Sequence, residues 1–154
     1  MIRKRLIRDG MKLLLGLSAW LAVSESRAGA SRRLMQAMAG ATVRSKRIRP
    51  AITLDQLGDA WQRGFPSRKQ VPITAVTEST VFAEIHTPCP LRGSGNLQAC
   101  HRMMEYDRRL LEHAGGQFVV LESQATPGRL HCRVAMRMAG VDTADLVPAH
   151  EQPP

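Results

Sequence analysis

The sequence predicts an α+β fold, in which one central helix packs on an antiparallel sheet of two hairpins and further helices precede the first strand. Two observations carry this prediction. Two pairs of short strand-like runs each enclose a turn, and one helical stretch lies between the pairs, so the order is strand, strand, helix, strand, strand. At 154 residues the chain is long enough for a single core that needs no disulfides.

Charge and composition divide the chain into three expected parts. Residues 1–50 are a basic N-terminal helical segment and linker, residues 51–147 are the α+β core domain, and residues 148–154 are a disordered tail. The first boundary rests on charge, because residues 1–50 hold 12 Lys and Arg against 2 Asp and Glu, whereas residues 51–154 hold 10 against 11. We therefore expect a chain that starts near Thr53 to fold without the first segment.

The N-terminus admits two interpretations. A basic start, an apolar run over 13–23 and small residues at 28–30 follow the outline of a signal peptide, although the run of 11 residues is too short to span a bilayer. The alternative is an amphipathic helix that packs on the domain or lies on a membrane surface, with apolar positions at Leu6, Leu13, Leu14, Leu17 and Leu21. The odd number of cysteines favours a reducing compartment. We expect a cytoplasmic protein with at most a weak membrane contact, and export is the alternative.

The helices expected next are short and have identifiable ends. Ser31 is suited to cap a helix over 31–41, and the basic stretch 42–50 is expected to be an exposed linker. Thr53 is suited to cap a helix that Gly64 ends.

The two hairpins follow from alternating apolar residues on either side of turn sequences. The first pairs residues 73–77 with 80–87, and the second pairs residues 118–123 with 129–138 across Thr126-Pro127-Gly128. The helix between them runs from Asn96 to His113, and a Gly-Gly pair ends it. In the last strand the predicted inner face holds Cys132, and the opposite face holds Arg133 and Arg137.

One face of this central helix combines apolar residues with a charge: Leu97, Cys100, Met104, Asp107 and Leu111 share it. A buried carboxylate costs several kcal/mol unless it is paired or bound to something, so Asp107 is a candidate site residue. Seven residues place it about 10 Å from Cys100 along the helix axis, at the other end of a shared pocket. The alternative is a structural ion pair with Arg108, Arg133 or Arg137.

The three cysteines are expected to converge on the first turn of that helix. Cys132 points at the helix from its strand, Cys89 ends a strand next to the connecting loop, and Cys100 opens the helix. Thiolates are ligands for transition metals, so this set is a candidate site for zinc or iron. The alternative is that each cysteine is an ordinary small core residue.

Five elements in order also resemble those of a known family. They are Cys89-Pro90 at a strand end, Cys100 opening a helix, Tyr106-Asp107, the Gly115-Gly116 break and Cys132 in a hairpin. In this stretch, 86–137, the chain resembles the L-2-amino-thiazoline-4-carboxylic acid hydrolase family. The resemblance implies a hydrolase that opens a C–N ring bond of a small cyclic amidine or thiazoline carboxylate. The module is also similar to the small-molecule-binding domain of the 4-vinyl-reductase type, which implies a non-catalytic binding module instead.

The hydrolase reading assigns roles to individual residues. Cys100 and Asp107 are the expected catalytic residues, and Arg133, Arg102 and Tyr106 are expected to bind the substrate, with an arginine on its carboxylate. The partner is therefore a small molecule. Low aromatic content, 4%, argues against nucleic-acid binding. Motifs of the P-loop, GxGxxG, HExxH and GxSxG types are missing from the sequence, which argues against those classes.

Overall fold

The computed structural model describes the backbone of residues 2–153 and the side chains of residue 10 and residues 12–153, and it has the predicted α+β class. The helices are α1 (Ile2–Val23), α2 (Ala28–Lys46), α3 (Leu54–Arg63), α4 (Leu97–Met103) and α5 (Glu105–His113), with short 3₁₀ turns at Glu25–Arg27 and Arg68–Gln70. The strands are β1 (Ile73–Val76), β2 (Val81–Ile85), β3 (Gly116–Glu122) and β4 (Cys132–Met138).

The four strands form one antiparallel sheet in the order β1-β2-β4-β3, so the two predicted hairpins join through β2 and β4. In the central ladder Val81 pairs with Met136 and Ile85 pairs with Cys132. Alternate residues of β2 and β4 therefore face the helices, and their neighbours face the opposite side of the sheet.

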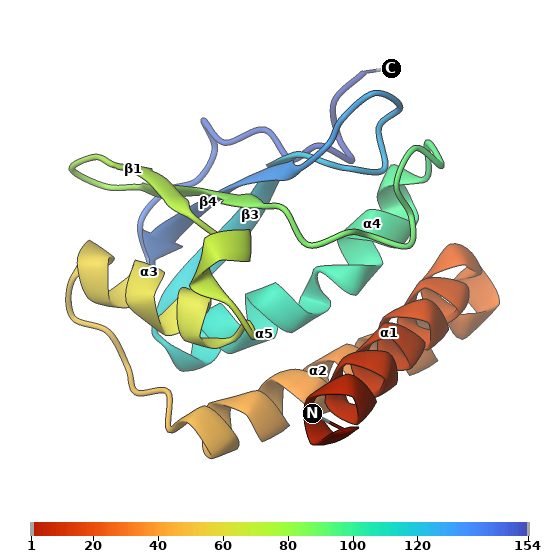
Figure 1. Cartoon of the computed structure of the whole chain (residues 1–154). Helices are drawn as coiled ribbons and strands as arrows, with labels where there is room; N and C mark the ends of the chain where they lie inside the picture. The colour runs from red at the N-terminus through yellow and green to blue at the C-terminus, as the bar shows by residue number, and fades with distance from the viewer. Residues whose placement is uncertain (1, 154) are drawn as a thin grey trace.

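The main core lies between the sheet and helices α3 and α5 (Figure 1). Its fully buried side chains come from the two helices and from the inner face of the sheet, among them Leu57, Trp61, Leu110, Leu111, Val81, Val134 and Met136. Full burial of an aliphatic side chain of this size contributes about 1.5–3 kcal/mol. The sheet and these helices are thus one unit held by apolar contact.

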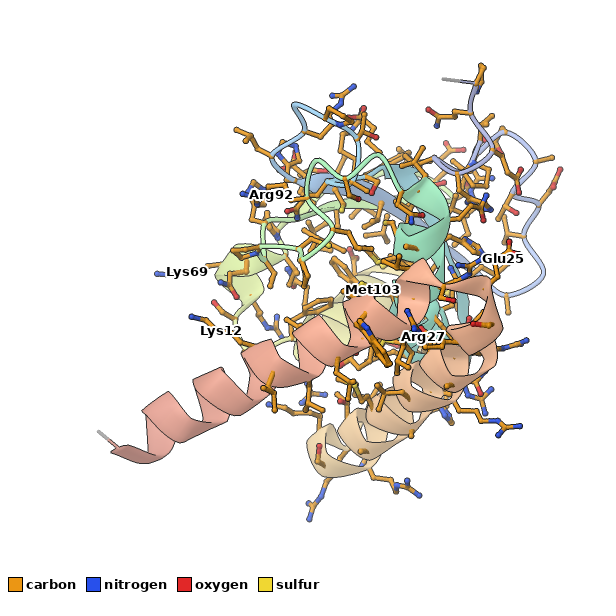
Figure 2. All side chains as sticks on the ribbon, turned by 90° about the vertical axis from the view of Figure 1, so that its right-hand side faces the viewer. Lys12, Glu25, Arg27, Lys69, Arg92 and Met103 are labelled. Atoms are coloured by element: carbon orange, nitrogen blue, oxygen red, sulfur yellow. The ribbon has the colours of Figure 1, made fainter. Side chains whose placement is uncertain are left out.

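Helices α1 and α2 form a further layer outside α4 and α5 (Figure 1). Ala39 of α2 and Ile48 belong to the main core, while Ala19 and Ala22 of α1 pack with Ala99 and Cys100. Figure 2 shows α1 crossing α4, with Met103 at this contact. The first 50 residues therefore cover the core and are not a separate basic segment.

The predicted exposed linker over 42–50 is corrected, since α2 continues to Lys46 and Ile48 is buried. The reason is the division of α2 between two faces. Its basic residues, such as Arg32 and Arg44, are exposed, whereas Met35 and Ala39 face the core. The net charge of residues 1–50 reflects the exposed face of α2 and gives no sign of its buried apolar face. Removal of residues 1–50 is therefore expected to expose core residues and to destabilise the fold.

The central helix is broken at Met104 into α4 and α5, where a single helix was predicted. Its start is as expected, because the Asn96 side chain accepts a hydrogen bond from the Ala99 N–H at 2.9 Å. Thr53 likewise caps α3, accepting from the Gln56 N–H at 3.3 Å.

The C-terminal segment packs along β3, so the predicted disorder of residues 148–154 is corrected as far as residue 153. Ala149 is buried and its N–H donates to the Val120 carbonyl at 2.8 Å, and the Gln152 side chain donates to the Leu121 carbonyl at 3.0 Å. β3 is an edge strand with free backbone groups, and these groups hold a segment whose polar composition suggested disorder.

Among the residues that the structure describes, no helix has both the length and the apolar character needed to cross a membrane.

Candidate functional site

Asp107 lies in the core, 4% exposed, on the face of α5 that was predicted to be apolar. Its Oδ1 accepts a hydrogen bond from Trp61 Nε1 at 2.8 Å. Burial raises the pKa of Asp107 from 3.8 to about 6, while the Trp61 hydrogen bond and the charge of Arg108 act in the opposite direction. This carboxyl group therefore changes its charge close to neutral pH.

The arginines that could have neutralised Asp107 are engaged elsewhere. Arg108 binds Glu105 at 3.1 Å, Arg133 binds Glu122 at 2.8 Å, and the buried Arg137 binds Asp145 at 2.6 Å. Among the described side chains, Asp107 has no ion pair within 4.0 Å. Asp107 therefore does not form the structural ion pair with Arg108, Arg133 or Arg137.

Trp61 reaches Asp107 because α3 and α5 approach closely. Leu57 and Trp61 lie one turn apart on α3 and are both fully buried. The helix ends at Gly64, where an added Cβ would lie 2.6 Å from Leu110 Cδ1, so a larger residue would force the Leu110 side chain to shift. The indole also contacts the rings of Phe65 and Phe118, with ring centroids 5.0 Å and 6.3 Å away.

The three cysteines are free and lie on the helix-covered side of the sheet. Each sulfur accepts one hydrogen bond: Cys100 from Ser123 Oγ at 2.9 Å, Cys132 from the Gln124 N–H at 3.3 Å and Cys89 from the Leu91 N–H at 3.4 Å. Ser123 and Gln124, directly after β3, therefore connect two of the thiols.

Gln124 extends this connection to the third cysteine. Its side chain is fully buried, and its Oε1 accepts from the Cys89 N–H at 3.3 Å and from Arg92 at 2.7 Å. Its Nε2 donates to the carbonyls of Ile85 and Thr87, each at 3.0 Å. All of its hydrogen-bonding capacity is used, as expected for a buried amide.

The thiols are protonated at neutral pH. Burial raises the pKa of Cys100 to about 11 and that of Cys132 to about 12, and it also raises the pKa of Cys89. The negative charge of Asp107, and that of Cys89 when it ionises, raise the pKa values of Cys100 and Cys132 further. Cys100 and Cys132 are thus near enough to Cys89 and Asp107 to be influenced by their charges.

A metal ion held by all three thiolates stays a prediction. Sulfurs around a tetrahedral zinc lie about 3.8 Å apart, given Zn–S bonds of about 2.3 Å. Within the described part of the chain, the three sulfurs do not form a group whose ligand atoms all lie within 4.8 Å of one another. Such a site would require the thiols to move closer together.

The residues predicted to bind the substrate have other partners in this arrangement. Arg102 donates to the Ala22 carbonyl at 2.8 Å, and Arg133 lies exposed on the opposite face of the sheet from Cys132. The Tyr106 hydroxyl donates to the Gly64 carbonyl at 2.7 Å. Their roles in substrate binding remain predictions.

Sequence reasoning missed Trp61, Ser123 and Gln124. Trp61 has a signal, since it lies on the apolar face of a strongly amphipathic helix, but nothing in the sequence pairs it with a residue 46 positions later. Ser123 and Gln124 follow the end of a strand and resemble ordinary turn residues.

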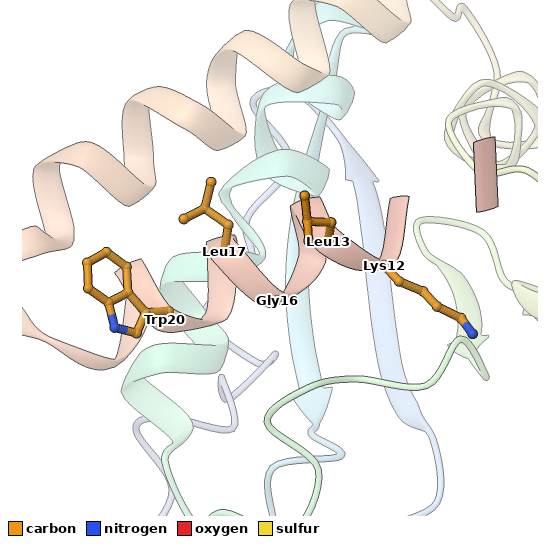
Figure 3. A pocket seen from close by; sticks show the side chains of 5 residues that line it. All are labelled: Lys12, Leu13, Gly16, Leu17 and Trp20. Carbon is orange, nitrogen blue, oxygen red and sulfur yellow. The ribbon is translucent and has the colours of Figure 1, made fainter. Parts of the chain in front are cut away.

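A second surface feature lies on α1. An exposed apolar patch, the α1 patch, is formed by Lys12, Leu13, Gly16, Leu17 and Trp20, which follow one another along the helix (Figure 3). Leu13 is 78% exposed and Trp20 is 56% exposed, with the Arg27 guanidinium 3.9 Å from the indole centroid. The opposite face of α1 packs on α4 through Ala19 and Ala22.

No family model matches this chain, and neither the curated proteins nor the solved structures contain a match to it.

Proposed function

We propose that this chain is a hydrolase-like protein that opens a C–N ring bond of a small cyclic amidine or thiazoline carboxylate, with Cys100 and Asp107 as its catalytic residues. The observation that carries the proposal is Asp107, a buried carboxylate with a neutral hydrogen-bond donor and no described cation. A group in this state is destabilised until a cation reaches it. An amidinium, which is planar, cationic and rich in N–H donors, is the matching ligand.

The chemistry follows from this pairing. The Asp107 carboxylate holds the amidinium, which makes the carbon between the ring sulfur and ring nitrogen electrophilic. The Cys100 sulfur adds to that carbon, and its proton goes to the ring nitrogen as the C–N bond breaks. Water then adds to the same carbon, and the Cys100 sulfur leaves with one of the protons of that water. The products are S-carbamoyl-cysteine and the regenerated Cys100 thiol. Ser123 Oγ–H, 2.9 Å from the Cys100 sulfur, supports the developing thiolate.

The alternative proposal is a non-catalytic small-molecule-binding module. Its specific support is the state of the thiols: all three have raised pKa values, and Cys100 and Cys132 are buried. A thiol with a pKa of about 11 is a poor nucleophile until it loses its proton. Asp107 alone would suffice to bind an amidinium.

One experiment separates the two proposals. L-2-amino-thiazoline-4-carboxylate is incubated with the full chain, products are separated by mass, and binding is measured by calorimetry. The hydrolase proposal expects S-carbamoyl-cysteine from the wild type, and binding without product from Cys100→Ser. Opening at the C–S bond instead would give N-carbamoyl-cysteine and a free thiol, which thiol reagents detect. Binding by the wild type without any product favours the binding module, and the absence of both binding and product refutes both proposals.

We also propose a weak contact between the α1 patch and anionic membrane surfaces. Its leucines and tryptophan are exposed, and five basic residues occur within the first twelve positions of the sequence. Anionic lipid headgroups attract basic residues, and exposed apolar side chains can insert at the boundary between headgroups and acyl chains.

A further inference from the structure

Three metal-ligating side chains meet on the outer face of the sheet, away from the thiols. Glu84 and His86 are two residues apart at the end of β2, and His131 precedes Cys132 at the start of β4. Ile85 pairs with Cys132 and both are buried, so the residues that flank them face outward together. One ligand atom from each of Glu84, His86 and His131 lies within 4.8 Å of the other two.

The carboxylate of Glu84 contacts both imidazoles, one through each of its oxygens. His86 Nε2 is 2.7 Å from Glu84 Oε2, and His131 Nε2 is 3.5 Å from Glu84 Oε1. The two rings are stacked, with centroids 4.8 Å apart and planes inclined by 20°. Both ring nitrogens on the carboxylate side are thus Nε2, the atom through which histidine commonly binds metals.

The two nearby arginines form ion pairs with a different carboxylate, that of Glu122. Arg133 is the cross-strand partner of Glu84, yet its guanidinium binds Glu122 at 2.8 Å. Arg129 binds the same carboxylate, Glu122, at 2.7 Å. Arg129 and Arg133 therefore share Glu122. His86 and His131 share Glu84. This distribution keeps the Glu84 carboxylate available as a metal ligand.

We propose that Glu84, His86 and His131 bind one divalent transition-metal ion, with Zn²⁺ as the reference ion, through two imidazole nitrogens and one carboxylate oxygen. Two histidines with one carboxylate are a ligand set of protein zinc and iron sites. Ligands about 2.0–2.1 Å from a tetrahedral ion lie about 3.3–3.4 Å apart, so small rotations of the side chains complete the geometry.

The surroundings suit such rotations. The side chains of His86, His131 and Glu84 are 44%, 35% and 27% exposed, so they can turn and a metal ion can reach them from solvent. Their backbone is fixed, because Ile85 and Cys132 anchor the strands in the core. The remaining coordination positions face water and could accept an anionic ligand. This site is independent of the function proposed for Asp107 and Cys100.

The test measures binding of Zn²⁺ alone to the full chain by equilibrium dialysis under reducing conditions. One equivalent should bind to the wild type, and His86→Asn and His131→Asn should each weaken binding about 10-fold or more. His113→Asn, which changes an exposed histidine at the end of α5, is the matched control and should bind as the wild type does. Thermal melts without metal should agree among all four proteins, because these side chains are partly or fully exposed.

Co²⁺ distinguishes this site from one built by the cysteines. Bound Co²⁺ should show visible d–d absorption without the near-ultraviolet charge-transfer band of a cobalt thiolate. Binding should also weaken on acidification, since protons compete with the metal for the imidazole nitrogens. The proposal is overturned if no stoichiometric binding occurs, if the two histidine variants bind like the control, or if a thiolate band appears and Cys132→Ser abolishes binding.

Discussion

Asp107→Asn should change how the stability of the protein depends on pH. Asparagine keeps the shape of the side chain and an oxygen that can accept from Trp61 Nε1, but it cannot ionise. In the wild type the pKa of Asp107 is about 6 in the folded state against an ordinary value of 3.8. The folded protein therefore binds this proton more tightly than the unfolded chain does.

The sign and size of the effect follow by linkage. The stabilisation from the bound proton is fully present below pH 3.8 and is lost as the pH rises through about 6. A shift of about 2 pKa units corresponds to about 3 kcal/mol. The stability difference between variant and wild type should therefore move by up to about 3 kcal/mol in favour of asparagine between pH 4 and pH 7. In a domain of this size that is about 6–12 °C in melting temperature.

Differences between the two pH profiles isolate Asp107, because other titrating groups contribute equally to both proteins. Burial of the asparagine NH2 group without a partner also lowers the stability of the variant. This loss does not depend on pH, so it shifts the whole profile and leaves its pH dependence unchanged. Asp59→Asn, a partly exposed carboxylate on α3 that pairs with arginines, is the control and should shift stability by only a few tenths of a kcal/mol. Parallel profiles for Asp107→Asn and the wild type would refute the argument that burial perturbs this group.

Fluorescence reports the same proton at its site. Trp61 is one of two tryptophans, and Trp20 can be replaced by phenylalanine so that only the indole bonded to Asp107 emits. Its emission should titrate with a midpoint near pH 6, and the Asp107→Asn variant should lack this transition. If Asp107 is also a site residue, this variant should reduce turnover or ligand binding by about 10²-fold.

Three further predictions test the packing and the surfaces. Tyr106→Phe should lower the free energy of unfolding by about 0.5–1.5 kcal/mol in urea, because the hydroxyl is bonded within the fold. Weaker ligand binding by this variant would support the predicted substrate role, and unchanged binding would contradict it. Gly116→Ala should cost about 1–3 kcal/mol, since the new Cβ would lie 2.5 Å from Leu57 Cδ1 and 3.0 Å from a backbone oxygen, whereas Gly29→Ala, with open space, should not destabilise. Leu17→Gln should reduce sedimentation with anionic vesicles, and equal binding to neutral vesicles would contradict the charge argument.

The elements that the sequence predicts correctly are those with local signals. The alternation around residues 78–79 and 126–128 identifies both hairpins, and the caps Thr53 and Asn96 mark two helix starts. Elements that depend on distant contacts were predicted less well. The break at Met104 and the packing of Ala149 on β3 have no local pattern, because tertiary partners decide them.

The candidate site shows the same limit. Helical spacing was enough to predict that Asp107 is buried, because the position of a residue on a helix face is a local property. The identity of its neighbour was not predictable, since Trp61 arrives from another helix. The arginines considered as partners belong to ion pairs that form on other surfaces, and charge in the sequence does not show which surface a side chain faces.

The strand register separates the two candidate sites. Cys132 and Ile85 pair across β4 and β2 and face the helices, whereas the residues beside them, His131 and His86, face the opposite side. A single backbone ladder thus holds the buried thiol of Cys132 on one face and the partly exposed imidazoles beside it on the other. A metal ion on the outer face would bind without rearranging the core, and a change at Asp107 would alter the core without disturbing Glu84. Effects of substitutions in the two sites should therefore add, as they do for residues without shared partners.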